Sequence, residues 1–125
     1  MAKSTADIVF DQALNYVKNN GTRITVCDTE PTTYTEAITT FKLADVDITS
    51  GDYTGPAAGD VSGRKVTVNA QAGVTVDSTG TATHVAIVDV PNTTLLIVTT
   101  CTSQAIVATS TIDIPAWDIE IEDPT

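Results

Sequence analysis

Apolar and polar residues alternate with a period of two along much of this chain, as side chains do on a half-buried β-strand. The clearest stretch covers residues 64–102, where short alternating segments are separated by turn residues. Within it, residues 81–90 and 95–102 are predicted to form the central hairpin. Residues 95–98 are apolar on both faces, and we therefore expect this strand to lie at the centre of a sheet, covered on each side.

One segment near the start of the chain has helical spacing instead. Its apolar residues recur at intervals of three or four and share one face: Phe10, Ala13, Leu14 and Val17. Residues 4–7 resemble a capping box, and Asn20-Gly21 is a helix stop with glycine suited to the left-handed cap. We predict one amphipathic helix over about residues 5–19. Its single apolar stripe favours a lid on one sheet face, with a docking element for a partner as the alternative.

Further short segments extend the strand pattern on both sides of the central stretch. Residues 22–28 and 43–48 are predicted strands, and residues 34–41 fit either a short helix or a strand. One or two more strands follow within residues 105–114. Residues 117–122 alternate strictly, and the side chains expected to face the core are Trp117, Ile119 and Ile121.

The length of 125 residues corresponds to one domain, residues 1–125, that can bury a core without metals or disulfides. The strand pattern predicts a mainly β (α+β) fold, an antiparallel β-sandwich or barrel-like sheet with one N-terminal helix. A net charge of −10 and a pI of about 4.1 disfavour nucleic acid and anionic membranes as partners. Neither a signal-peptide h-region nor an apolar run of membrane-spanning length is found, so we expect a soluble chain made in a cytosol.

The segment over residues 50–63 is dense in glycine, aspartate and serine, and we predict that it forms one long exposed loop. Loops often carry binding residues, so contact with a neighbouring subunit and a plain connector stand as equal interpretations. The basic pair that follows could form a salt bridge to a neighbour, although a solvated strand end is more common. The candidate partner contacts are Asp52, Tyr53, Asp60, Arg64 and Lys65.

The two cysteines, Cys27 and Cys101, both fall in predicted strands. Two buried and reduced side chains are the favoured interpretation, because synthesis in a cytosol disfavours disulfides. A disulfide formed after release into an oxidising medium is the alternative. A metal site built on the two cysteines lacks further ligands at suitable spacing.

Residue types that carry catalysis are scarce in this sequence. The one histidine, His84, lies among apolar residues of a predicted strand, as a packing residue does. The carboxylates Asp118, Glu120 and Glu122 project from one strand face. They could hold a cation weakly, but a solvated face that discourages edge-to-edge pairing is the favoured interpretation. No nucleophile elbow, phosphate loop or EF-hand pattern is found, and we expect no enzymatic activity and no cofactor.

Several segments follow one another along the chain in a recognisable order: TADIVFDQALNYVKNN, VCDTEPTTYTEA, SGDYT, SGRKVTVNAQ, ATHVAIVD, LLIVTTCTSQAI and IPAWDIEIEDPT. This order resembles that of small structural proteins of tailed bacteriophages. The similarity runs over nearly the whole chain. It implies a non-enzymatic part of a phage particle and brings no catalytic residue with it.

Among phage structural proteins, the first expectation from the resemblance is a capsid decoration (cement) protein, which oligomerises and bridges neighbouring capsid subunits. A tail, neck or fibre-attachment component is the alternative within the virion, and a carbohydrate-binding module is the alternative from another class. The expected partners are the major capsid protein or other virion proteins, together with further copies of the chain. The expected location is the virion, after synthesis in the cytoplasm of a bacterial host.

Overall fold

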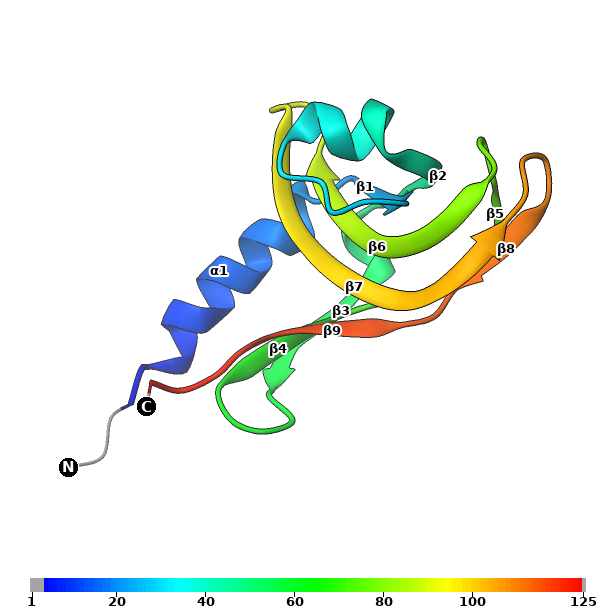
Figure 1. Cartoon of the computed structure of the whole chain (residues 1–125). Helices are drawn as coiled ribbons and strands as arrows, with labels where there is room; N and C mark the ends of the chain where they lie inside the picture. Colours follow the sequence, from blue (N-terminus) through cyan, green and yellow to red (C-terminus); the bar gives the residue numbers. More distant parts are fainter. Residues whose placement is uncertain (1–3, 125) are drawn as a thin grey trace.

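A four-stranded antiparallel sheet lies at the centre of the computed structural model, which describes residues 4–124 (Figure 1). Its strands lie in the order β2 (Lys42–Asp47), β1 (Arg23–Cys27), β6 (Gly80–Asp89) and β7 (Thr94–Ile106). The β-branched residues of β1 and β6 suit a pleated surface, and both strands are largely buried. The predicted mainly β class with one N-terminal helix is confirmed, in open sheets rather than in a barrel.

The strand β7 pairs with β6 in the predicted hairpin, but it lies at an edge of the sheet and not at its centre. Its residues 95–98 are half-buried. The prediction of a central strand was wrong because apolar residues on both faces indicate only that both faces are covered. They do not indicate how many neighbours a strand has in the plane of the sheet.

Two smaller antiparallel sheets cover one face of the large sheet. One contains β3 (Tyr53–Ala58), β4 (Arg64–Val68) and β9 (Trp117–Ile121), and the other pairs β5 (Gln71–Thr75) with β8 (Thr111–Ile114). Figure 1 shows β4 and β9 passing beneath the curved β6–β7 hairpin. Buried residues of β4 join those of β1 and β6 in one core, onto which the predicted inward residues of β9 also pack: Trp117, Ile119 and Ile121.

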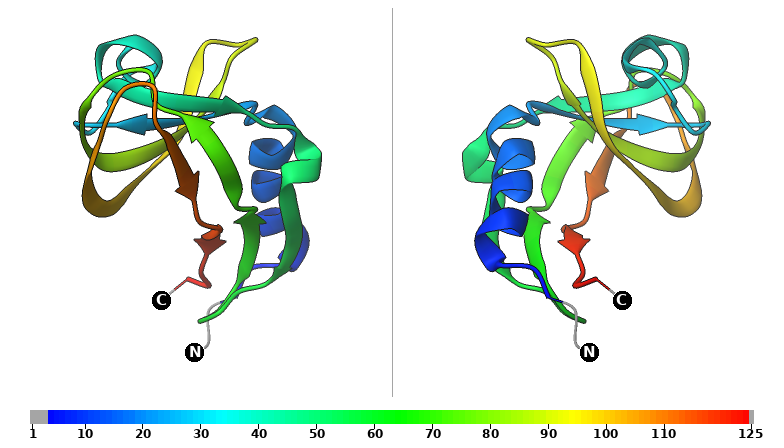
Figure 2. Two further views of the ribbon diagram at one scale, coloured as in Figure 1. Left: turned by 90° about the vertical axis from the view of Figure 1, so that its right-hand side faces the viewer. Right: turned by 90° about the vertical axis from the view of Figure 1, so that its left-hand side faces the viewer.

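The predicted N-terminal helix is α1 (Asp7–Asn20), which lies against β3 and β4 (Figure 2). Its buried residues are Phe10, Leu14 and Val17, so the lid interpretation holds for this face. The capping-box prediction was wrong, because Ala6 is the N-cap and no side chain caps the helix. Gly21 ends the helix with φ of −76° rather than in the left-handed region. Glycine is required there because a Cβ would lie 2.4 Å from the Tyr53 hydroxyl.

The opposite face of the large sheet carries a second, smaller apolar cluster. The segment over residues 34–41, which the sequence left open, forms a π-helical turn, η1 (Glu36–Thr40). The fully buried Ala37 of η1 packs with Ala86 and Val88 of β6. Figure 1 shows η1 across the large sheet from β4 and β9. The sheet is therefore covered on both faces, which accounts for the apolar residues on both sides of β7.

Candidate functional site

The predicted exposed loop over residues 50–63 is mostly regular structure. Residues Ser50–Asp52 form a 3₁₀ turn, η2, and β3 begins directly after it. The prediction of one long loop was wrong because glycine and proline disfavour strands by their local preference, whereas here β4 supplies a pairing partner. Residues 59–63 remain as the irregular turn between β3 and β4.

Two of the predicted partner contacts, Asp52 and Tyr53, form hydrogen bonds within the chain. Asp52 completes a capping box at η2, where its Oδ2 accepts the backbone N–H of Thr49 at 2.8 Å. Tyr53 is 5% exposed, and its hydroxyl donates to the carbonyl oxygen of Gly21 at 2.9 Å. Burial raises the pKa of Tyr53 to about 12. The side chain of Tyr53 therefore joins β3 to the end of α1 and leaves little surface for a partner.

Arg64, another predicted contact, is engaged by the chain's own helix. Its Nε lies 2.8 Å from Oδ1 of Asp11, and its Nη1 lies 4.0 Å from Oδ2 of Asp7. The hydrogen bond with Asp11 raises the pKa of Arg64. The pair fixes α1 on β4, so the guanidinium has a partner without any neighbouring subunit.

Lys65 and Asp60 belong to a charged cluster on the exposed side of β4 and β9. The Nζ of Lys65 lies 2.7 Å from Oδ1 of Asp60 and 3.2 Å from Oδ2 of Asp118. Thr67 donates to Oδ1 of Asp118 at 2.7 Å, and this bond is the main reason that the pKa of Asp118 is lowered. The hydrogen bond with Asp60 is the main reason that the pKa of Lys65 is raised.

The row of carboxylates on β9 points outward as predicted, but two of its members have donors within the chain. Glu120 accepts the backbone N–H groups of Asp60 and Val61 and so orders the turn between β3 and β4. Asp118 is held by β4, whereas Glu122 is exposed. Among residues 4–124, no group of three or more His, Cys, Asp or Glu side chains is placed to hold a metal ion.

The two cysteines lie on strands that are not neighbours. Cys27 on β1 and Cys101 on β7 are separated by β6, and both are free. One intervening strand puts about 9–10 Å between their backbones, beyond the roughly 7 Å over which a disulfide can form. Cys27 packs towards Ala37 on one face, whereas Cys101 packs on the main core. The disulfide interpretation therefore fails within one chain, and burial raises the pKa of both thiols.

His84 is half-buried on β6, and its Nδ1 lies 2.8 Å from the hydroxyl oxygen of Thr83. This neighbour satisfies one ring nitrogen locally. The predicted role of a packing residue agrees with this arrangement.

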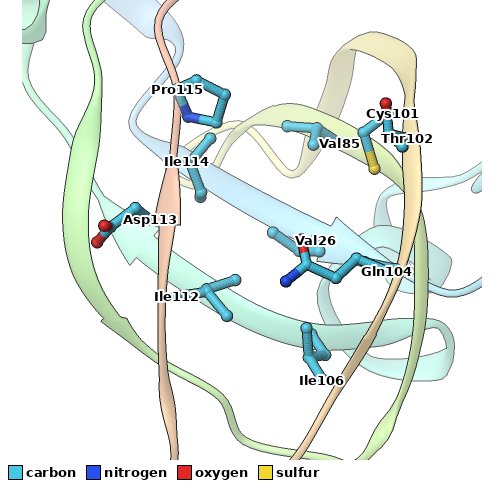
Figure 3. A pocket seen from close by; sticks show the side chains of 11 residues that line it. Val26, Val85, Cys101, Thr102, Gln104, Ile106, Ile112, Asp113, Ile114 and Pro115 are labelled. Atoms are coloured by element: carbon cyan, nitrogen blue, oxygen red, sulfur yellow. The ribbon is translucent and has the colours of Figure 1, made fainter.

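A groove that the sequence did not reveal runs between the edge strand β7 and the segment from β8 to β9. It consists of two adjoining hollows of about 200 Å³ and about 370 Å³. Figure 3 shows side chains of β7 facing those of β8 across the first hollow. The residues that line both hollows are mostly apolar: Val85, Cys101, Thr102, Ile114 and Pro115. No local pattern predicts this groove, because its walls come from segments that meet only in the folded chain.

Trp117 lies on the far wall of the second hollow. Its indole N–H is buried, and among the described residues it has no hydrogen-bond acceptor. Such a group costs about 1–3 kcal/mol relative to a satisfied one. The tryptophan ring contributes to the core from this position rather than forming an open aromatic platform.

Several large apolar side chains are exposed away from this groove. Three of them belong to α1, where Ile8, Val9 and Tyr16 are 60%, 57% and 54% exposed. Val61 lies in the turn between β3 and β4, and Val107 follows the end of β7. Ala13 was predicted on the inward stripe of α1, but it is exposed. It follows helical spacing with Val9 and Tyr16, and this second apolar pattern was not recognised in the sequence.

Comparison with protein-family models, with curated proteins and with solved structures finds no match in any of the three. The helix found within residues 4–124 does not have the length and apolar character needed to span a membrane.

Proposed function

We propose that this chain is a non-enzymatic structural protein of a phage virion that acts through protein–protein contacts, in the first place as a capsid decoration protein. The similarity of its segments to phage structural proteins supports a place in the particle. The observation that carries the contact role is that α1 exposes three large apolar side chains on its outer side, Ile8, Val9 and Tyr16, which are all more than half exposed. Large apolar side chains that are exposed together mark interaction surfaces.

The helix α1 is suited to present such a face because its other side is already anchored. Phe10, Leu14 and Val17 are buried against the sheet, and the Arg64–Asp11 ion pair fixes the helix on β4. A rigid helix loses little conformational entropy when its exposed side chains are covered by a partner. The inner face of α1 therefore acts as a lid, and the outer face supports its role as a docking element.

The carbohydrate-binding alternative has less support from the arrangement of the aromatic residues. Phe10 and Tyr53 are buried, and Trp117 packs on the core. Tyr16 is more than half exposed, but it lies on the convex surface of a helix. Sugar-binding sites are concave and combine aromatic faces with convergent polar groups.

Counting the copies of this chain in purified virions tests its place in the particle. The proposal predicts a copy number in proportion to that of the capsid subunits. A copy number fixed at a few per particle would instead support a tail, neck or fibre-attachment component. Absence of the chain from purified virions would contradict both.

The contact face is tested with the triple variant Ile8→Gln, Val9→Gln and Tyr16→Gln. Glutamine keeps good helix propensity while it removes the apolar surface. Its affinity for undecorated capsids should fall by more than about tenfold, as expected when an interface loses its main apolar anchors. Val61→Gln with Val107→Gln is the matched control and should bind as wild type does, because these exposed apolar residues do not belong to α1. Equal binding by both variants would contradict the proposed face.

A further inference from the structure

The outer edge of β7 is a long row of backbone groups without a strand beside it. β7 contains 13 residues, and within residues 4–124 it pairs with β6 and with no second strand. An edge strand leaves part of its N–H and C=O groups unpaired, so it can template the addition of another strand. The length of β7 makes it the largest such edge of the molecule.

Three features by which proteins discourage edge-to-edge association are charged side chains, prolines and a short edge strand. This edge has none of the three, although its ladder with β6 is irregular between Ala82 and His84 and between Ile87 and Val88. None of the residues in Thr94–Ile106 is charged, and none is proline. This is notable in a chain with 16 acidic residues and a net charge of −10. Two copies would repel each other over most of their surface, but least along β7.

The groove described above lies along part of the same edge. Residues 99–102 of β7 form one of its walls, and residues 114–118 form the opposite wall. In β-strand addition, backbone hydrogen bonds supply affinity, and alternate side chains of the added strand enter pockets beside the edge. The groove is placed to receive those alternate side chains.

We propose that β7 is the surface at which two copies of this chain pair, edge to edge and antiparallel, so that their four-stranded sheets become one continuous sheet. Two identical edges in antiparallel orientation are related by a two-fold axis, so each edge is its own complement. Threonines on the two edges can form the cross-strand pairs that stabilise such a ladder. The pairing is a property of the purified chain and does not depend on the proposed role in the virion.

The opposite edge of the sheet explains why the association stops at two copies. Along β2, the carbonyl oxygen of Leu43 accepts the N–H groups of Asp77 and Ser78, and Ala44 forms a bridge with Val76. This edge is therefore partly occupied from within the chain, at Leu43 and Ala44. A closed dimer follows, rather than a fibre that grows from both edges.

The experiment compares the full chain with the variant Thr100→Lys/Thr102→Lys by sedimentation equilibrium over a range of concentrations. Both threonines are exposed on β7. The full chain should show a monomer–dimer equilibrium, and the variant should raise its dissociation constant by at least about tenfold, because four lysines are then brought together along the paired edges. The matched control is Thr39→Lys/Thr40→Lys, which makes the same change at exposed positions of η1 and should dimerise as wild type does.

A second measurement reports on the groove itself. Trp117 is the one tryptophan of the chain and lines the second hollow, so its fluorescence should shift with the same concentration dependence as dimer formation. Circular dichroism of each variant shows that it is folded. A full chain that stays monomeric at all concentrations would overturn the proposal. So would a dimer that both lysine variants weaken equally, or a monomer whose β7 edge pairs with a different protein.

The two proposals fail separately. Loss of dimerisation in the Thr100→Lys/Thr102→Lys variant, with binding to capsids retained, leaves the outer face of α1 as the capsid contact. Capsid binding by the α1 triple variant, with dimerisation unchanged, contradicts the proposed function and leaves β7 pairing intact.

Discussion

The two edges of the four-stranded sheet differ in how their backbone groups are satisfied. On the β2 side, backbone N–H groups of Asp77 and Ser78 donate to Leu43 at 2.7 Å and 3.0 Å, and the strand itself carries charges. Lys42 is paired with Asp77, and Asp47 with Arg23. On the β7 side, no charged residue occurs in 13 positions, and within the described residues no strand lies alongside.

Within one sheet, therefore, one edge is protected against pairing with other molecules and the other edge is not. The β2 edge is covered by a following segment of the chain and carries the charges that prevent pairing with other molecules. The β7 edge has neither, although the same chain has acidic residues in abundance elsewhere. An edge left open and uncharged in an otherwise acidic protein supports the proposed pairing of two copies.

The largest effect expected to distinguish the two edges is the loss of unfolding free energy when one leucine side chain on each strand is shortened to alanine. Leu43 on β2 is 3% exposed and lies against Gly80, whereas Leu96 on β7 is half-buried. Leu43→Ala should therefore lower the free energy of unfolding by about 2–5 kcal/mol. Leu96→Ala should lower it by about 1–2 kcal/mol, because only part of its surface is removed from water in the isolated chain. Urea unfolding at low protein concentration measures both.

The matched pair keeps the chemistry of the substitution constant, so the difference reports burial alone. An unchanged m-value confirms that the unfolding transition remains comparable. Equal losses for the two variants would mean that β7 is as well covered in the monomer as β2 is, and this would remove the basis of the comparison.

Much of the fold could be predicted from the sequence because side-chain periodicity reports local burial. The helix was placed within two residues at its start, and the alternation over Trp117–Ile121 identified both β9 and its inward face. The position of β7 could not be predicted, since two different clusters cover its faces while its edge stays free. The side-chain pattern indicates what lies above and below a strand. Neighbours within the sheet instead pair through backbone groups, which are the same for almost every residue type.

The candidate site was predicted less well, for a different physical reason. Glycine, aspartate and serine near residue 52 suggested a loop, but β3 forms because β4 lies beside it. Tyr53 and Arg64 were predicted as contacts from their place in and after the expected loop, whereas within the chain long-range partners bury one and pair the other. The groove beside β7 has walls from β7, β8 and β9 and leaves no local signal.

Hydrogen exchange gives a second, smaller contrast between the edges. In dilute solution, the most rapidly exchanging amides of residues 99–105 should exchange at least about tenfold faster than those of residues 43–46, because exposed edge amides open most readily. At high concentration, the amides of β7 should become protected while those of β2 stay the same. Slow exchange on β7 in dilute solution would contradict a free edge, and protection that appears equally on both strands would indicate non-specific association.

The smallest expected effect concerns the charged pair that helps to cover β2. Lys42 Nζ lies 3.1 Å from Oδ2 of Asp77, and this hydrogen bond is the main cause that lowers the pKa of Asp77 below its ordinary value of 3.8. A carboxyl whose pKa is depressed by folding adds stability above the unfolded pKa, and the contribution is lost as the pH falls through the folded value. The pair is largely exposed to solvent, so its contribution should be less than about 1 kcal/mol.

The variant Asp77→Asn removes this contribution and tests its link to the edge. Its deficit in unfolding free energy relative to wild type should be fully present at pH 7. The deficit should shrink as the pH falls below about 3.8, the ordinary pKa, and should vanish once Asp77 is protonated in the folded chain as well. The backbone N–H of residue 77 still reaches Leu43, so the amides of β2 should exchange only slightly faster, and those of β7 should not change. Asp60→Asn is the control, because it breaks an exposed lysine pair on another sheet and should leave β2 exchange unaltered. A deficit that grows on acidification would show that the Lys42–Asp77 pair does not stabilise the covered edge.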